Sequence, residues 1–107
     1  MTTIAVLGAG IMATALATPL TDNGHEVRLV GTHLDAAEID SIRTSGVHPR
    51  LDRPLPAALR AFQLERAGEA FDGAEVALVG VNSFGVRWAG QRLAGLLRPG
   101  MDVLVVA

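Results

Sequence analysis

Two glycines near the start of the chain form a pattern that could hold a phosphate group. The stretch 8–13, Gly-Ala-Gly-Ile-Met-Ala, matches G-x-G-x-x-G/A and lies between an expected strand and an expected helix. Gly8 would allow a tight turn, Gly10 would let the backbone approach a diphosphate, and Ala13 would let the helix lie close to the strand. The unpaired amides at the start of the helix would then face the anion. The alternative is a glycine turn that serves close packing alone.

The end of the second expected strand is where dinucleotide-binding folds carry an acid that bonds the adenosine ribose. Here residues 30–33 read Val-Gly-Thr-His, and the next carboxylate is Asp35. A carboxylate about 4 Å from a 2′-phosphate would cost about 4 kcal/mol at an effective dielectric constant of about 20, so its absence makes NADP admissible. Thr32 and His33 could bond that phosphate through a hydroxyl and an imidazole.

Several polar residues also have a purely structural interpretation. Thr32-x-x-Asp35 has the pattern of a capping box for the next helix. Arg50 or Arg53 could reach the same phosphate from a long loop, and the sequence does not say what either one contacts. His25 follows an Asn-Gly pair and is better explained as a turn residue than as a ligand. Because the histidines are dispersed, we expect no metal site.

A third group of residues follows the fourth expected strand. Val81 ends that strand, and Asn82, Ser83 and Phe84 come directly after it. In an open parallel sheet this carboxyl edge is where the diphosphate and nicotinamide of a bound coenzyme would pass. Ser83 could instead cap the following helix, and Phe84 could pack on the coenzyme or on the core.

Apolar runs and helical periodicity place these residues in an alternating order of strands and helices. We expect strands at 4–7, 26–30, 59–63, 75–81 and 102–106, and helices at 11–21, 35–44, 65–71 and 86–97. Residues 46–58 contain three prolines and no period, which predicts a long ordered loop. Pro19 should kink the first helix near Ala15 or end it shortly afterwards. The order predicts an α/β fold, an open parallel sheet of about five strands with helices on both faces.

Length and composition limit the classes of protein. At 107 residues the chain is one domain, 1–107, and half of its residues are hydrophobic. The net charge is −2 with charges scattered singly, which argues against binding to nucleic acid or to an anionic membrane surface. No cysteine is present, which excludes disulfides and thiolate catalysis. The uncharged start lacks the basic residues of a signal peptide and is a weak membrane span, so we expect a cytoplasmic protein.

The whole chain resembles the N-terminal domain of NAD(P)-dependent glycerol-3-phosphate dehydrogenases. The matching segments, in order, are "IAVLGAGIMATALATPLTDNGHEVRLVG", a proline-rich loop ending "PLP", "LRAF", "FDGAEVALVGVNSFGVRWAGQRLAGLLRPG" and "VLVVA". The most specific parts are the Asn-Gly-His-Glu turn at 23–26 and Ser83 with Arg87 four residues later. The resemblance implies a Rossmann-like fold that binds NAD or NADP.

The resemblance also implies which residues contact the coenzyme: Ile11 and Met12 after the glycines, Thr32 and His33 near the adenosine ribose or its phosphate, and Asn82 and Ser83 by the nicotinamide. The family usually has an aromatic or serine pair in place of Ile11 and Met12, a proline in place of Asn82, and often an arginine at 32 or 33. Its catalytic lysine comes directly beyond Ala107, and its C-terminal helical domain is missing from this chain. We therefore expect a fragment of a longer enzyme, inactive by itself.

For the full-length protein the resemblance implies a homodimer that transfers hydride between NAD(P)H and dihydroxyacetone phosphate, giving sn-glycerol 3-phosphate for phospholipid biosynthesis. One alternative is the same domain of a ketopantoate reductase or of an enzyme like 6-phosphogluconate dehydrogenase, since these share the glycine turn. A second alternative is a nucleotide-binding module without an active site. The sequence leaves the choice between NAD and NADP open.

Overall fold

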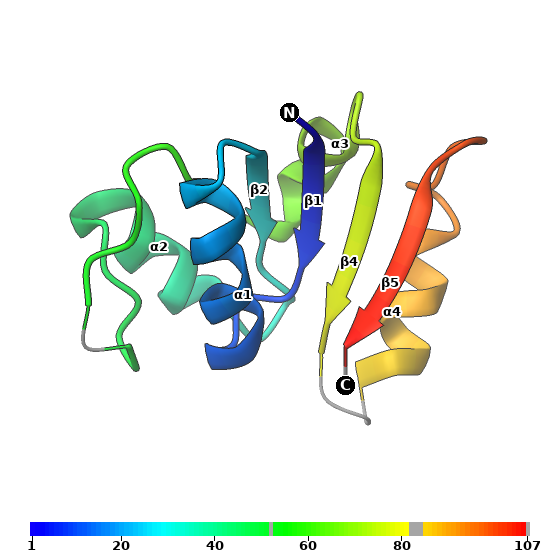
Figure 1. The fold of residues 1–107 in the computed structure, drawn as a ribbon. Helices are drawn as coiled ribbons and strands as arrows, with labels where there is room; N and C mark the ends of the chain where they lie inside the picture. Colours follow the sequence, from blue (N-terminus) through cyan, green and yellow to red (C-terminus); the bar gives the residue numbers. More distant parts are fainter. Residues whose placement is uncertain (52, 82–84, 107) are drawn as a thin grey trace.

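A computed structural model describes residues 1–51, 53–81 and 85–106 of the chain. Over these residues five parallel strands form one sheet in the order β3-β2-β1-β4-β5 (Figure 1). The strands are β1 Thr3–Leu7, β2 Glu26–Val30, β3 Arg60–Phe62, β4 Val76–Gly80 and β5 Asp102–Val106. The helical segments are α1 Ile11–Asp22, α2 Ala36–Ser45, the 3-10 turn η1 Leu64–Arg66, α3 Ala67–Phe71 and α4 Val86–Leu93. The predicted α/β class with an open parallel sheet is confirmed.

The central strand β1 is buried on both faces because its side chains are apolar at every position from Ile4 on. Ile4 and Val6 belong to a cluster with α1 and α2, whereas Ala5 and Leu7 belong to a cluster with α3 and α4. Alternate residues of a strand point to opposite faces, so one strand joins both cores. Helices therefore cover both faces of the sheet, as predicted.

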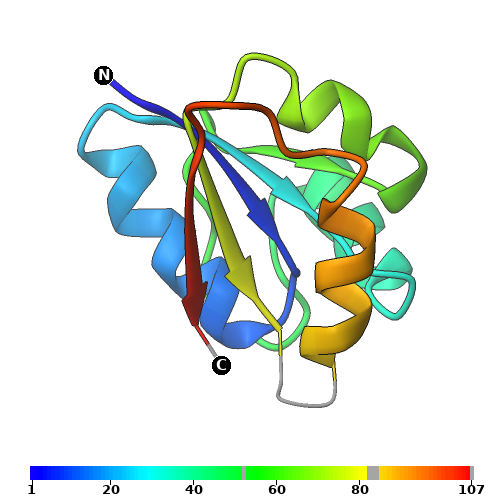
Figure 2. The ribbon, with the colours of Figure 1, turned by 90° about the vertical axis from the view of Figure 1, so that its right-hand side faces the viewer.

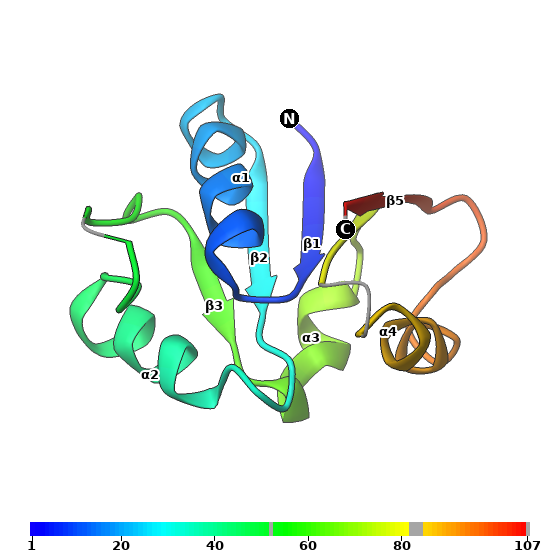
Figure 3. The ribbon, with the colours of Figure 1, turned by 90° about the horizontal axis from the view of Figure 1, so that it is seen from below.

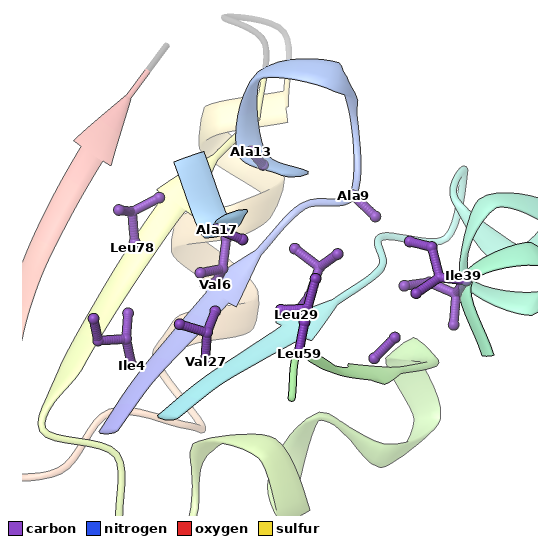
Figure 4. Close-up of a cluster of buried hydrophobic side chains, with 12 residues drawn as sticks. Ile4, Val6, Ala9, Ala13, Ala17, Val27, Leu29, Ile39, Leu59 and Leu78 are labelled. Carbon is purple, nitrogen blue, oxygen red and sulfur yellow. The ribbon is translucent and has the colours of Figure 1, made fainter. Parts of the chain in front are cut away.

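The two layers of helices are plain in the ribbon views. Figure 2 shows the sheet between α1 on one side and α4 on the other, and Figure 3, seen from below Figure 1, shows α1 opposite α3 and α4. Figure 4 shows the core under α1, where Ala13 and Ala17 lie over Val6. Small side chains on α1 bring this helix close to the sheet.

Four predicted elements differ from the observed ones in type or by more than one residue in length: the last helix, the helix 65–71, and the strands 59–63 and 75–81. The last of these is β4 Val76–Gly80, so Val81 follows the strand and does not end it. The last helix ends at Leu93 and not at 97, because Gly95 and Leu96 donate to carbonyls only three residues back, at Arg92 and Leu93. These bonds form a tighter turn, which still lets Leu96 pack against the core. The expected helix 65–71 is a 3-10 turn followed by α3, and the expected strand 59–63 is reduced to β3.

Pro19 lies inside α1, and the helix ends three residues later at Asp22. The amide of Asn23 donates to the Pro19 carbonyl at 3.0 Å, so the last turn is hydrogen bonded. This agrees with the second of the two predicted outcomes for Pro19, an end shortly after the proline. The following Gly24, with φ +89°, lets the chain turn into β2.

Candidate functional site

The carboxyl ends of three neighbouring strands stop at the same level of the sheet. Leu7 of β1 is paired with Val30 of β2 and with Val79 of β4. The residue after each of these three is a glycine, so Gly8, Gly31 and Gly80 form a row across the sheet edge; these three residues are called the glycine row below. The arrows of β1, β4 and β5 in Figure 1 point to this edge, and Figure 3 looks onto it. In parallel sheets, ligand sites lie outside this edge.

Each member of the glycine row gives room to a specific neighbour. A Cβ at Gly8, where φ is +119°, would collide with the Gly80 carbonyl oxygen. A Cβ at Gly80 would lie 2.7 Å from the Cβ of Ala13, and one at Gly31 would lie 2.6 Å from Cγ1 of Ile39. The absent side chains therefore let α1 and α2 start close against the strands.

Gly10 differs from the glycine row because nothing lies within 4 Å of the position where its Cβ would stand. Gly10 is the N-cap of α1, with φ −71° and ψ −179°, and its carbonyl accepts from the amide of Thr14 at 3.1 Å. The first amides of a helix have no partner inside the helix and attract anions. The open space at Gly10 is thus the space in which a phosphate group can meet these amides.

A cleft of about 1120 Å³ lies at this edge. It is lined by eight of the residues predicted from the sequence: Gly8, Gly10, Ile11, Met12, Ala13, Thr32, His33 and Val81. The other predicted coenzyme contacts, Asn82, Ser83 and Phe84, lie outside the described residues. Ile11 and Met12 are 44% and 53% exposed, so the first turn of α1 presents apolar side chains to the cleft rim.

The structure adds lining residues that the sequence did not single out. They are Leu34, Asp35, Glu38, Gly80, Gly85, Trp88 and Val106. Arg50 had been one of two candidate arginines, and it lines the cleft whereas Arg53 does not. The ring of Trp88 on α4 packs against His33, with 5.0 Å between the ring centroids. These residues come from the turn after β2, α2, the long loop, β4, α4 and β5, so the fold and not local sequence brings them together.

Thr32 and Asp35 are bonded to each other, as the capping-box pattern suggested, but in a different arrangement. Oδ2 of Asp35 accepts from the Thr32 amide at 2.9 Å and from the Thr32 hydroxyl at 2.8 Å. The Thr32 hydroxyl oxygen accepts from the amide of Leu34 at 3.2 Å, and α2 begins only at Ala36. The Thr32 hydroxyl is therefore engaged inside this turn.

The structure shows where acidic side chains lie relative to the expected ribose position. Gly31, at the end of β2, has no room for a carboxylate because Ile39 fills that space. Asp35 nevertheless lines the cleft, with its side chain buried and turned onto the glycine turn, where Oδ2 accepts from the amide of Ala9 at 3.1 Å. Its charge is thus held by donors of the protein, and it differs from an acid that faces a ribose.

The long loop contributes a side chain whose place the sequence did not predict. His48 is fully buried, and its Nε2 lies 2.7 Å from the carbonyl oxygen of Ala9 in the glycine turn. The loop doubles back on itself through a bridge between Val47 and Pro54, which brings His48 to the turn. No spacing rule relates His48 to Ala9, 39 residues away, so only the folded chain reveals the contact.

Two other kinds of feature are absent from the part of the chain that the structure describes. There, no cluster of three or more histidine or acidic side chains is placed to hold a metal ion. Within the same residues no helix has the length and apolar character needed to cross a membrane.

Comparison with known proteins gives one consistent result. The family model described as the N-terminus of NAD-dependent glycerol-3-phosphate dehydrogenase matches residues 3–107. The NADP(+)-dependent glycerol-3-phosphate dehydrogenase of Archaeoglobus fulgidus is 38% identical over 102 residues, which are 95% of this chain and 30% of the relative. A glycerol-3-phosphate dehydrogenase [NAD(P)+] of Exiguobacterium is 36% identical over 110 residues, covering all of this chain and 31% of that protein. The chain thus spans about 30% of the length of these relatives.

Solved structures agree with the sequence comparison. The crystal structure of glycerol-3-phosphate dehydrogenase from Coxiella burnetii aligns with a TM-score of 0.85 at 29% identity, over 95% of this chain and 31% of that one. A putative ketopantoate reductase from Ralstonia solanacearum aligns with a TM-score of 0.74 at 23% identity, over 98% of this chain and 31% of that one. The second likeness shows a common fold alone.

Proposed function

This chain belongs to the NAD-dependent glycerol-3-phosphate dehydrogenase family, whose N-terminal model it matches, and from that premise we propose that its cleft binds NADH or NADPH. We further propose that residues 1–107 act as one coenzyme-binding domain. The observation that carries the proposal is the open space at Gly10, in front of the first turn of α1. A diphosphate fits there because backbone amides are present and no side chain stands in the way.

Each group of cleft residues has a proposed role in holding the coenzyme. Gly8 and Ala13 set the turn and the approach of α1, and Gly10, Ile11 and Met12 present backbone to the diphosphate. Thr32 and His33 would lie at the adenosine ribose or its phosphate. The nicotinamide side would be formed by Val81, Asn82, Ser83 and Phe84. These assignments are supported by the shared cleft and by the family, except that 82–84 lie outside the described residues.

Arg50 supports the inclusion of NADPH in the proposal. Its side chain is exposed, and it lines the same cleft as Thr32 and His33. Gly31 leaves no acid at the end of β2 to repel a 2′-phosphate, and a guanidinium pairs well with phosphate oxygens. The A. fulgidus relative is itself named as NADP-dependent.

For the enzyme that contains this domain we propose reversible hydride transfer between NAD(P)H and dihydroxyacetone phosphate, giving sn-glycerol 3-phosphate. The nicotinamide supplies or accepts the hydride, and the residues of this chain bind and orient it. The chain contains no lysine, so the carbonyl-polarising lysine of the family, expected beyond Ala107, is not one of its residues. We assign no catalytic residue within 1–107. By family we also propose a homodimer that acts in the cytoplasm and provides glycerol 3-phosphate for phospholipid biosynthesis.

Trp88 provides a direct test of coenzyme binding. It is the only tryptophan of the chain and it lines the cleft, so its fluorescence should change when NADH or NADPH binds. Calorimetric titration of the same chain and of Trp88→Phe gives a control that does not depend on the indole. The proposal fails if the folded chain binds neither coenzyme by calorimetry.

The substrate assignment needs a separate test on the enzyme that contains this domain. Oxidation of NADPH should depend on dihydroxyacetone phosphate, and ketopantoate should not replace it. Turnover with ketopantoate alone would instead assign the domain to the sister reductases, whose fold it shares.

A further inference from the structure

The central residue of the glycine turn is held by side chains from two distant segments. Ala9 lies between Gly8 and Gly10 and is fully buried. Its amide donates to Oδ2 of Asp35 at 3.1 Å, and its carbonyl oxygen lies 2.7 Å from Nε2 of His48. Both polar groups of Ala9 are thus satisfied by the protein.

The hydrogen bonds of His48 fix the position of its proton. The backbone amide of Arg50 can only donate, and it lies 3.1 Å from Nδ1 of His48, so Nδ1 is the acceptor. Nε2 must then carry the proton that is donated to the Ala9 carbonyl oxygen at 2.7 Å. A neutral imidazole with the proton on Nε2 satisfies both contacts.

Asp35 is equally well defined on the other side of Ala9. Its Oδ2 accepts from three donors: the Ala9 amide, the Thr32 amide and the Thr32 hydroxyl, at 3.1, 2.9 and 2.8 Å. An ionised carboxylate is an acceptor only, so three donors suit it. Asp35 therefore ties the glycine turn to the start of α2.

We propose that His48 and Asp35 are positioning residues that hold the two peptide groups flanking Ala9, so that the amides of Gly10 and of the first turn of α1 face the coenzyme diphosphate before it binds. The inference rests on the proposed coenzyme binding and assigns the long loop 46–58 a part in it. Neither residue touches the diphosphate in this role; both act through Ala9.

The physical reason lies in the flanking glycines. Gly8 and Gly10 have few conformational restrictions, so the peptides on either side of Ala9 would rotate among several orientations if nothing held them. Only the orientation that aims the amides outward binds the anion, and the apparent dissociation constant rises as the population of that orientation falls. If removal of the His48 donor leaves this orientation populated about a tenth of the time, the constant rises about tenfold.

The test compares three variants of the chain by NADPH titration and thermal unfolding. His48→Phe fills the buried site without a donor, His48→Gln keeps an N–H where Nε2 stands, and Arg53→Ala changes an exposed residue of the same loop that lies off the cleft. We expect about tenfold weaker binding for His48→Phe, recovery to within about threefold for His48→Gln, and no change for Arg53→Ala. Equal binding by folded His48→Phe, or no recovery with His48→Gln, overturns the proposal.

Hydrogen exchange of the unmodified chain tests whether the glycine turn is ordered before the coenzyme binds, and it does so even if His48→Phe does not fold. The Ala9 amide should exchange slowly without coenzyme and remain equally slow when NADPH is added. Protection that appears only on addition of NADPH shows that the coenzyme orders the turn, and this contradicts the proposal. If the Ala9 amide exchanges slowly but the chain binds no coenzyme, the turn is held as proposed and the proposed function fails. The two proposals can therefore fail separately.

Discussion

Ala13 on α1 and Gly80 at the end of β4 are in direct contact, with no space for a side chain on Gly80. A Cβ added to Gly80 would lie 2.7 Å from the Cβ of Ala13 and 3.3 Å from its Cα. Ala13, the third small residue of the G-x-G-x-x-A motif, therefore contacts a glycine that lies 67 residues further along the chain. The motif lets α1 pack closely against β4 only because β4 also ends in a glycine.

Gly80→Ala should destabilise the chain by about 1–3 kcal/mol, because α1 must shift away from β4 to admit the methyl group. Urea unfolding followed by circular dichroism measures the change. Gly90→Ala is the matched control, since Gly90 lies within α4 and nothing is within 4 Å of its added Cβ. It should gain up to about 1 kcal/mol from the lower flexibility of the unfolded chain. Equal stability of the two variants would contradict the close contact of α1 with β4.

The two glycines of the turn should respond differently to the same substitution. Gly8→Ala places a Cβ against the Gly80 carbonyl at a φ of +119°, so it should destabilise the fold and reduce the yield of folded protein. Gly10→Ala meets open space at an ordinary φ of −71°, so its unfolding free energy should stay within about 1 kcal/mol of the parent.

Coenzyme titration completes this comparison. Gly10→Ala should bind NADH and NADPH at least about tenfold more weakly, because its methyl group occupies the space in front of the first amides of α1. A stable Gly10→Ala chain with unchanged affinity would show that the diphosphate does not lie at this turn.

The parts of the fold that the sequence predicted are those fixed by local pattern. The uninterrupted apolar run of β1 predicted a strand buried on both faces, and the spacing of Gly8, Gly10 and Ala13 predicted the turn and the start of α1. In each case one segment contains all the information, because the period of the side chains decides which face is buried.

The parts that the sequence could not predict depend on contacts between distant segments. His48 reaches Ala9 only because Val47 bridges to Pro54, and Asp35 reaches Ala9 only because β1 and β2 end level. Leu96 and Leu97 continue the apolar stripe of α4, so periodicity alone extended that helix past its observed end. Leu96 packs against the core from a 3-10 turn, so its burial does not require the α-helix to continue.

Arg28 of β2 should contribute more to stability than the neighbouring Arg60 of β3. The guanidinium of Arg28 donates to the carbonyl oxygens of Ala70 at 3.2 Å and Asp72 at 2.5 Å, at the end of α3, and to Glu26 at 2.9 Å. Its side chain is only 15% exposed. Arg28→Met should therefore cost about 1–3 kcal/mol, because the half-buried Ala70 carbonyl loses its donor and the link to the end of α3 is lost.

Arg60→Met is the control for this prediction. Arg60 lies 3.8 Å from the same Glu26, but its side chain is 56% exposed, so its loss should cost about 1 kcal/mol or less. Chemical unfolding of both variants in parallel measures the difference. A larger loss for Arg60→Met would show that the Glu26 ion pair, and not the link to α3, stabilises this part of the sheet.

The exposed pair Arg66 and Glu69 predicts a local pH dependence. The hydrogen bond from Arg66 lowers the pKa of the Glu69 carboxyl below its usual value, with a smaller coulombic contribution from the same guanidinium. A lowered pKa in the folded state means that the pair stabilises the fold above the ordinary glutamate pKa and ceases to do so as the pH falls through the lowered value. NMR titration of Glu69 should show its pKa rising toward the usual value in Arg66→Gln; an unchanged titration would mean that the bond does not persist in solution.

Arg50 should make the cleft distinguish NADPH from NADH. The two coenzymes differ by the 2′-phosphate, and Arg50 lines the cleft together with Thr32. Gly31 carries no acid at the end of β2, and of the two carboxylates that do line the cleft, Asp35 and Glu38, that of Asp35 accepts from donors of the protein. Arg50→Gln should therefore weaken NADPH binding by about fivefold to tenfold, equivalent to ~1–1.4 kcal/mol, and leave NADH binding nearly unchanged.

Arg53→Gln is the control, because it removes the same charge from the same loop away from the cleft, and it should weaken the binding of neither coenzyme. Because a screened surface charge loses its effect in salt, the preference for NADPH should also shrink as the ionic strength rises. Equal losses for NADPH and NADH in Arg50→Gln would place Arg50 at a part of the coenzyme that both share.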